Sequence, residues 1–166
     1  MHLVARLAAI LSLRTGPQTL PAAPGLLTAI VVVDLLLSVA VLSTGLDFGQ
    51  ALLMVAMSIG AGLLFCYAAL YLRSLSNRFL QTATALFGTD IIITLVAMPL
   101  SFIAIQQLAP DGTGTLGPDV ALGLLIVTVW VLAVVGGIFR HALELSWPAA
   151  LAVALAYVVV TASITL

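Results

Sequence analysis

The sequence predicts an all-α fold, a polytopic membrane helix bundle with about five transmembrane helices and an N-terminal interfacial amphipathic helix. Two observations carry this prediction. The chain of 166 residues is 63% hydrophobic and only 7% charged, whereas soluble domains are about one quarter charged. Its apolar residues also gather in segments of about 20, the length of helix that crosses the hydrocarbon core of a bilayer. Most of the exposed surface must therefore face lipid.

Five segments have the required length, and the stretches between them contain the polar, Gly and Pro residues that are typical of segment ends. Residues 30–37 are apolar on every side except at Asp34, which is unlike the alternating pattern of a membrane barrel strand. The predicted organisation is a lead-in over 1–24 and a five-helix transmembrane domain over 25–166. The predicted spans are 25–44, 50–72, 83–107, 119–139 and 147–166.

The lead-in has a pattern of its own. Five apolar residues recur at helical spacing near the N-terminus: Leu3, Val4, Leu7, Ile10 and Leu11. This stripe indicates a short helix lying along the cytosolic leaflet, and the prolines at 17, 21 and 24 then direct the chain into the bilayer. A disordered leader is the alternative. No clean cleavage site follows Arg14, so we expect no signal-peptide removal.

The charges predict the topology. If the chain crosses the bilayer five times, all five arginines fall on one side: Arg6, Arg14, Arg73, Arg78 and Arg140. Asp47, Asp111 and Asp119 fall on the other side. Positive charge in short loops marks the cytoplasmic side. We therefore expect a cytoplasmic N-terminus, an external C-terminus, and arginines that anchor the cytosolic face.

Several function classes find no support. A net charge of −1 leaves no basic stripe for nucleic acid. Gly112, Gly114 and Gly117 match the dinucleotide fingerprint, but that motif works only between a strand and a helix, so we interpret it as an external hairpin loop. No group of residues has the spacing of a catalytic, cofactor or metal site. We interpret the single Cys66 as a buried apolar residue. We expect no enzyme activity and no cofactor.

The informative residues are two acids inside the predicted spans. An acidic side chain deep in a bilayer raises the free energy of membrane insertion by about 2.5 to 3.5 kcal/mol. Such a residue therefore indicates a structural or functional role. Asp34 and Asp90 start from the same side at depths that differ by only about 3 Å, and each has a hydroxyl one turn later, Ser38 and Thr94. We predict that these four residues form an intramembrane polar site. The favoured interpretation is a protonated acid that bonds helices together; the alternative is proton or cation handling.

The five-span layout resembles the Yip family of membrane-trafficking proteins and its bacterial relatives. The resemblance rests on short stretches: Gln18-Thr-Leu-Pro21, Arg78-Phe-Leu-Gln-Thr82, Leu86-Phe-Gly-Thr89, Val129-Trp130, Arg140-His141 and Ser146-Trp147-Pro-Ala-Ala150. It implies a multi-pass protein of the bacterial inner membrane. The chain lacks the family's long cytosolic N-terminal region and its Asp-Leu-Tyr-Gly-Pro motif, so no GTPase-binding role is carried over.

Two functions follow as hypotheses. The first is a non-enzymatic scaffold or accessory subunit of a larger membrane assembly, with a membrane-protein partner or a second copy of the chain, because small residues four apart favour close helix packing. The second is a small proton- or solute-coupled transporter that uses Asp34 and Asp90.

Overall fold

The computed structural model describes residues 3–108 and 114–164, and within these ranges the chain is helical with no strand. The all-α prediction is confirmed. The helices are α1 (Leu3–Leu11), α2 (Pro24–Leu42), α3 (Phe48–Leu72), α4 (Phe79–Gln107), α5 (Pro118–Leu143) and α6 (Trp147–Ala162), with short 3₁₀ turns η1 (Pro17–Thr19) and η2 (Ser76–Arg78). The expected loop around Gly112 and the two C-terminal residues lie outside the described residues.

The helix starts follow from local chemistry. Proline occupies the first turn of α2, α5 and α6, where its missing N–H would have no intrahelical partner. Asp47 caps α3 by accepting a 2.9 Å hydrogen bond from the backbone N–H of Gly49. These features place the helix ends within four residues of the predicted spans.

Four helices are long and apolar enough to cross a membrane: α2, α3, α4 together with η2, and α5. The chain is thus a multi-pass integral membrane protein by length and composition. The fifth predicted span corresponds to α6, which has 16 residues and a length of about 24 Å. Because this is shorter than a hydrocarbon core of about 30 Å, a fifth crossing stays a prediction.

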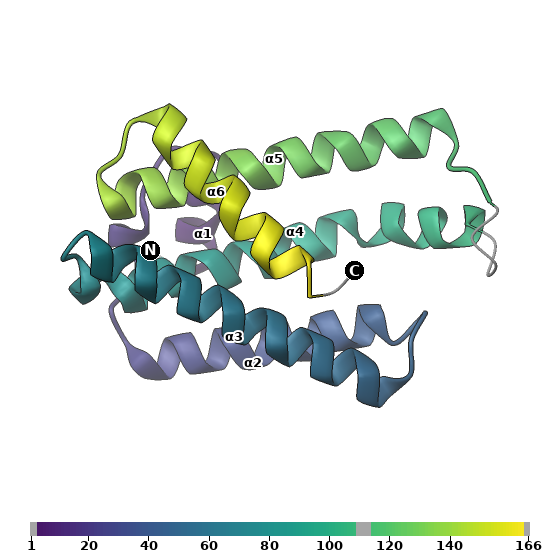
Figure 1. Ribbon diagram of the computed structural model, residues 1–166, viewed down its shortest axis with the longest axis horizontal. Coiled ribbons are helices and arrows are strands. Elements are labelled where there is room, and N and C mark those ends of the chain that lie inside the picture. The colour runs from purple at the N-terminus through teal and green to yellow at the C-terminus, as the bar shows by residue number, and fades with distance from the viewer. Residues whose placement is uncertain (1–2, 109–113, 165–166) are drawn as a thin grey trace.

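The long helices form two antiparallel pairs, α2 with α3 and α4 with α5 (Figure 1). Helix α4 packs extensively on α2, which joins the pairs, and α6 runs obliquely against α5 and α3 (Figure 1). Ala150 and Ala154 of α6 are fully buried, so close approach of small side chains holds α6 in place. The C-terminal end of α6 lies about midway along the bundle rather than at its far end (Figure 1).

The expected N-terminal helix forms as α1, but its apolar stripe differs from the prediction in one respect. Leu7 and Ile10 are buried in the main core against α4 and α5 instead of facing lipid, while Val4 is 68% exposed. The indole Nε1 of Trp130 donates to the carbonyl oxygen of Leu11, at 3.4 Å. Protein contacts thus cover most of the stripe, because α4 and α5 offer an apolar surface that continues the core.

All five arginines lie at the end of the bundle where α3 passes into α4 and α5 into α6, which we call the arginine end. The lead-in reaches this end because Gln18 donates to the carbonyl of His141 at 2.6 Å and Gln81 donates to the carbonyl of Leu20 at 2.8 Å. Asp47 and Asp119 lie at the opposite end, where α3 and α5 begin. The separation of charge seen in the sequence is therefore also a separation in space.

Candidate functional site: the Asp34–Asp90 cavity

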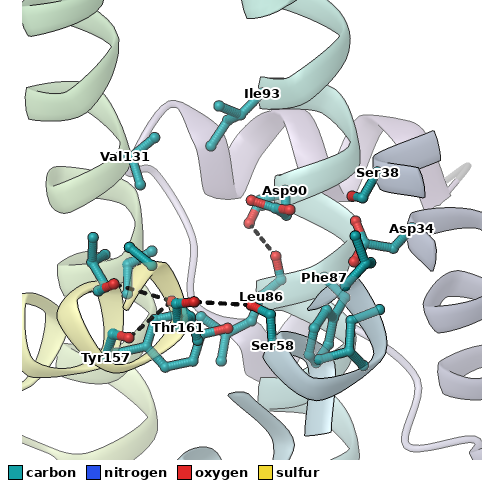
Figure 2. Close-up of a pocket in the computed structure, with 16 residues that line it drawn as sticks. Asp34, Ser38, Ser58, Leu86, Phe87, Asp90, Ile93, Val131, Tyr157 and Thr161 are labelled. Carbon is teal, nitrogen blue, oxygen red and sulfur yellow. Dashed lines mark hydrogen bonds between the residues drawn. The ribbon is translucent and has the colours of Figure 1, made fainter. Parts of the chain in front are cut away.

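A cavity of about 280 Å³ lies between α2, α3, α4, α5 and α6 (Figure 2). Four residues of the C-terminal half of α6 line it: Tyr157, Val158, Thr161 and Ala162. Asp34 is ten residues after the start of α2 and Asp90 eleven after the start of α4. Both acids therefore lie about 15 Å from the arginine end along their helices.

Asp34 of α2 and Asp90 of α4 both line this cavity, and their carboxyl groups lie on facing sides of the α2–α4 contact (Figure 2). Asp34 is only 3% exposed and its Oδ1 atom has no hydrogen-bond partner among the described residues. Asp90 is exposed and lines the same cavity. The pair can hold a proton or a positive charge.

Other hydroxyls line the cavity, and three of them donate a hydrogen bond to a backbone carbonyl. Ser58 donates to the carbonyl oxygen of Thr161 at 3.2 Å, Thr89 to that of Ala85 at 2.8 Å, and Thr161 to that of Tyr157 at 3.0 Å. Each oxygen keeps lone pairs that can accept a further hydrogen bond. These three hydroxyls therefore offer acceptors to the cavity.

The opposite wall is apolar. Tyr157 packs edge-on against Phe65 and Phe139, with ring centroids 5.7 and 5.6 Å away, and ties α6 to α3 and α5. Its hydroxyl fits over Gly62, where an added Cβ would lie 3.0 Å from that oxygen. The other apolar residues that line the cavity come from four helices: Val55, Ile59, Leu86, Phe87, Ile93, Val131, Val135 and Val158.

Three of the four predicted site residues line this cavity: Asp34, Asp90 and Ser38. Thr94 does not, although the structure describes it, because it lies one turn beyond Asp90 and past the lining residue Ile93. The hydroxyl of Ser38 makes no hydrogen bond to either carboxyl among the described contacts. The role of the site stays a prediction.

Sequence reasoning missed the contribution of α3 and α6, namely Ser58, Tyr157 and Thr161. A signal in the sequence was the spacing of Ser58 and Gly62, two small residues four apart, a pattern that favours helix packing in general. In the structure both face α6, Ser58 through its hydrogen bond and Gly62 through the Tyr157 hydroxyl. Their neighbours Ala56 and Gly60 are exposed, so helix α3 has a second small-residue face that points outward.

The arginines expected to anchor the cytosolic face have protein partners as well. Arg73 donates to the carbonyl of Leu143 at 3.3 Å, and Arg78 donates to the carbonyl of Ala142 at 3.2 Å. Both therefore cap the C-terminal end of α5, whose last carbonyls lack intrahelical partners. The guanidinium of Arg140 lies 5.1 Å from the ring centre of Trp147, Arg6 donates to the carbonyl of Thr19, and Arg14 is exposed.

The residues that the structure describes contain no group of three or more His, Cys, Asp or Glu side chains that could hold a metal ion. Cys66 is free and buried. Fold and cavity together define a class: a multi-pass, all-α integral membrane protein with an acidic, hydroxyl-lined cavity within its bundle. No protein-family model, curated protein or solved structure matches the chain, and its resemblance to the Yip family stays a prediction.

Proposed function

We propose that this protein is a small proton- or solute-coupled membrane transporter in which Asp34 and Asp90 hold the transported or coupling cation. The observation that supports the proposal is the cavity itself. A carboxyl pair that only bonded helices together would use its oxygens on hydroxyl or backbone partners, whereas Asp34 lines the cavity and its buried Oδ1 has no partner among the described residues. Ionisable groups inside a membrane bundle that face a cavity mark ion pathways in general.

Proton movement tests the proposal directly. The purified chain is placed in liposomes that contain a pH-sensitive dye, and a proton gradient and membrane potential are imposed. We expect faster proton flux than in protein-free liposomes, and Asp90→Asn should abolish the increase because an amide cannot exchange a proton at neutral pH. Asp47→Asn is the matched control, since Asp47 is an exposed acid at the opposite end and Asn also caps helices. Equal flux from the wild type and Asp90→Asn would contradict the proposal.

A second candidate function is a non-enzymatic scaffold or accessory subunit. The observation that favours it is the outward face of α3 at Ala56 and Gly60, where a Cβ added to Gly60 meets nothing within 4 Å. Small residues on an exposed membrane helix let another helix approach closely. Purification in a mild detergent followed by mass spectrometry tests this candidate: a fixed partner supports it, and a chain that runs alone contradicts it.

The proposed setting is the bacterial inner membrane, with the arginine end in the cytoplasm. The supporting observation is that all five arginines share one end of the bundle, where Glu144 is the one described acid, while Asp47 and Asp119 lie at the other end. In this orientation Asp34 and Asp90 lie near the middle of the membrane, because Asp34 is at the centre of α2.

A further inference from the structure

The charges around the cavity restrict what it can hold. Among the described residues that line it there are two carboxyls and no Arg, Lys or His. The last turn of α6, with Thr161 and Ala162, also faces the cavity, and the C-terminal end of a helix adds negative potential. An anion has no positive group to meet here, whereas a cation meets two acids and a helix dipole.

The hydrogen-bond partners of the cavity residues restrict the chemistry of the ligand further. The hydroxyl protons of Ser58, Thr89 and Thr161 go to backbone carbonyls, and Oδ1 of the nine-tenths buried Asp34 has no donor. Buried acceptors that lack donors are costly. A ligand that brings several N–H donors would satisfy them, and an ammonium group carries three N–H donors and no acceptor.

Size and the apolar wall complete the description. A volume of about 280 Å³ corresponds to roughly nine water molecules at about 30 Å³ each, which lies just below the range of drug-sized pockets. Valines and isoleucines of α3, α4 and α5 line the same space as the acids, and the rings of Phe87 and Tyr157 are part of this wall. A short alkyl or aryl body fits this wall, whereas a bare metal ion would leave it uncovered.

We infer that the cavity binds a small organic cation with N–H donors, a primary amine in its ammonium form. The ammonium group lies between Asp34 and Asp90, and the apolar body lies against the wall formed by α3, α4 and α5. This inference deepens the proposed function by naming the ligand class of the same site. If one carboxyl of the pair is protonated before binding, the ammonium ion enters as that proton leaves, which couples the ligand to proton exchange.

Butylammonium is a suitable probe, because it has one ammonium group and a four-carbon body. A ligand that binds only the folded state raises the unfolding midpoint in proportion to ln(1 + [L]/Kd). We expect butylammonium chloride to raise the thermal unfolding midpoint of the purified chain in detergent. Butyrate (the anion of the same length), butanol (the neutral counterpart) and tetramethylammonium (a cation without N–H) should give little or no rise.

Variants locate the site. Asp34→Asn and Asp90→Asn should each weaken butylammonium binding at least about tenfold, and Asp47→Asn should leave it unchanged. The comparison of the four probes on the wild-type chain does not depend on any variant folding. Equal stabilisation by butyrate, or full binding by both cavity variants, would overturn the inference, as would no stabilisation by butylammonium.

The outcomes for the site and for transport are separable. Proton flux in liposomes without butylammonium binding would overturn the inference and leave the proposed function in place. Butylammonium binding at Asp34 and Asp90 without flux of either protons or the amine would establish the ligand site and overturn the transport proposal. If the chain neither binds butylammonium nor moves protons or the amine, the ligand inference and the transport proposal are both refuted.

Discussion

Leu7 of α1 lies directly against Gly88 of α4, so that a Cβ placed on Gly88 would lie 2.9 Å from Cδ2 and 3.2 Å from Cδ1 of Leu7. Gly88 immediately precedes Thr89 and Asp90, two of the cavity residues. The absence of a side chain at this position is what lets α1 pack onto the part of α4 that carries the site.

This contact predicts opposite effects for two Gly→Ala variants. Alanine favours a helix over glycine by up to about 1 kcal/mol, and at Gly60 an added Cβ meets nothing within 4 Å. At Gly88 the same methyl overpacks the contact with Leu7, which costs about 1 to 3 kcal/mol. Unfolding in denaturant should therefore find Gly88→Ala less stable than Gly60→Ala. Adding Leu7→Ala should cost less in the Gly88→Ala background than in the wild type; a purely additive result would rule out the contact.

Substitutions of Asp34 separate its polar role from its volume. Asp34→Asn keeps a hydrogen-bonding side chain of the same shape, so we expect a stability loss below about 1.5 kcal/mol. Asp34→Leu puts an apolar group into the cavity beside Asp90 and removes any polar interaction of Asp34 with α4, so its unfolding midpoint should fall further while membrane insertion stays intact. A midpoint for Asp34→Leu at or above that of the wild type would show that the acid does not support packing.

Arg78 and Glu144 form an ion pair at 2.6 Å, with side chains 26% and 62% exposed. Because an exposed pair of this kind contributes about 0 to 1 kcal/mol, Glu144→Gln should change stability little. Arg78→Ala also removes the donors to the carbonyls of His141 and Ala142 at the end of α5, and we expect a loss of about 1 to 3 kcal/mol. Chemical unfolding of both variants measures the difference, and equal losses would contradict the capping role.

Ser74 follows α3 with φ of 58°, a left-handed conformation that costs a non-glycine residue about 1 kcal/mol. The backbone N–H of Leu75 donates to Leu70 at 2.8 Å, which is the hydrogen bond of a helix-ending turn that favours glycine. Ser74→Gly should raise stability by up to about 1 kcal/mol. Ser43→Gly is the control, since Ser43 has φ of −69° and glycine should not stabilise it.

The topology makes a further prediction. A reporter enzyme active only outside the cytoplasm should work when inserted near Gly114 or fused after Leu166, and should be inactive near Asn77. Activity near Asn77 would reverse the predicted orientation. Inactivity after Leu166 together with activity near Gly114 would mean that α6 does not complete a fifth crossing.

The sequence by itself determined the helical class, the approximate positions of the long helices and the gathering of arginines at one end. These features depend on local composition and segment length. In a bilayer these two properties decide the structure of a segment, because its backbone N–H and C=O groups must be hydrogen-bonded within the helix. The shared level of Asp34 and Asp90 also followed from counting residues along two helices that start at the same end.

Only the tertiary structure decided which residues complete the cavity. Thr94 was expected at the site because it lies one turn from Asp90, but proximity along one helix does not place a side chain on the face that meets another helix. Ser58, Tyr157 and Thr161 reach the acids through the oblique packing of the short α6 on α3 and α5. That packing depends on buried small residues such as Ala150 and Ala154, and many sequence positions offer similar residues. The length of α6 and its angle to its neighbours leave the space that the cavity occupies, and neither can be read from hydropathy.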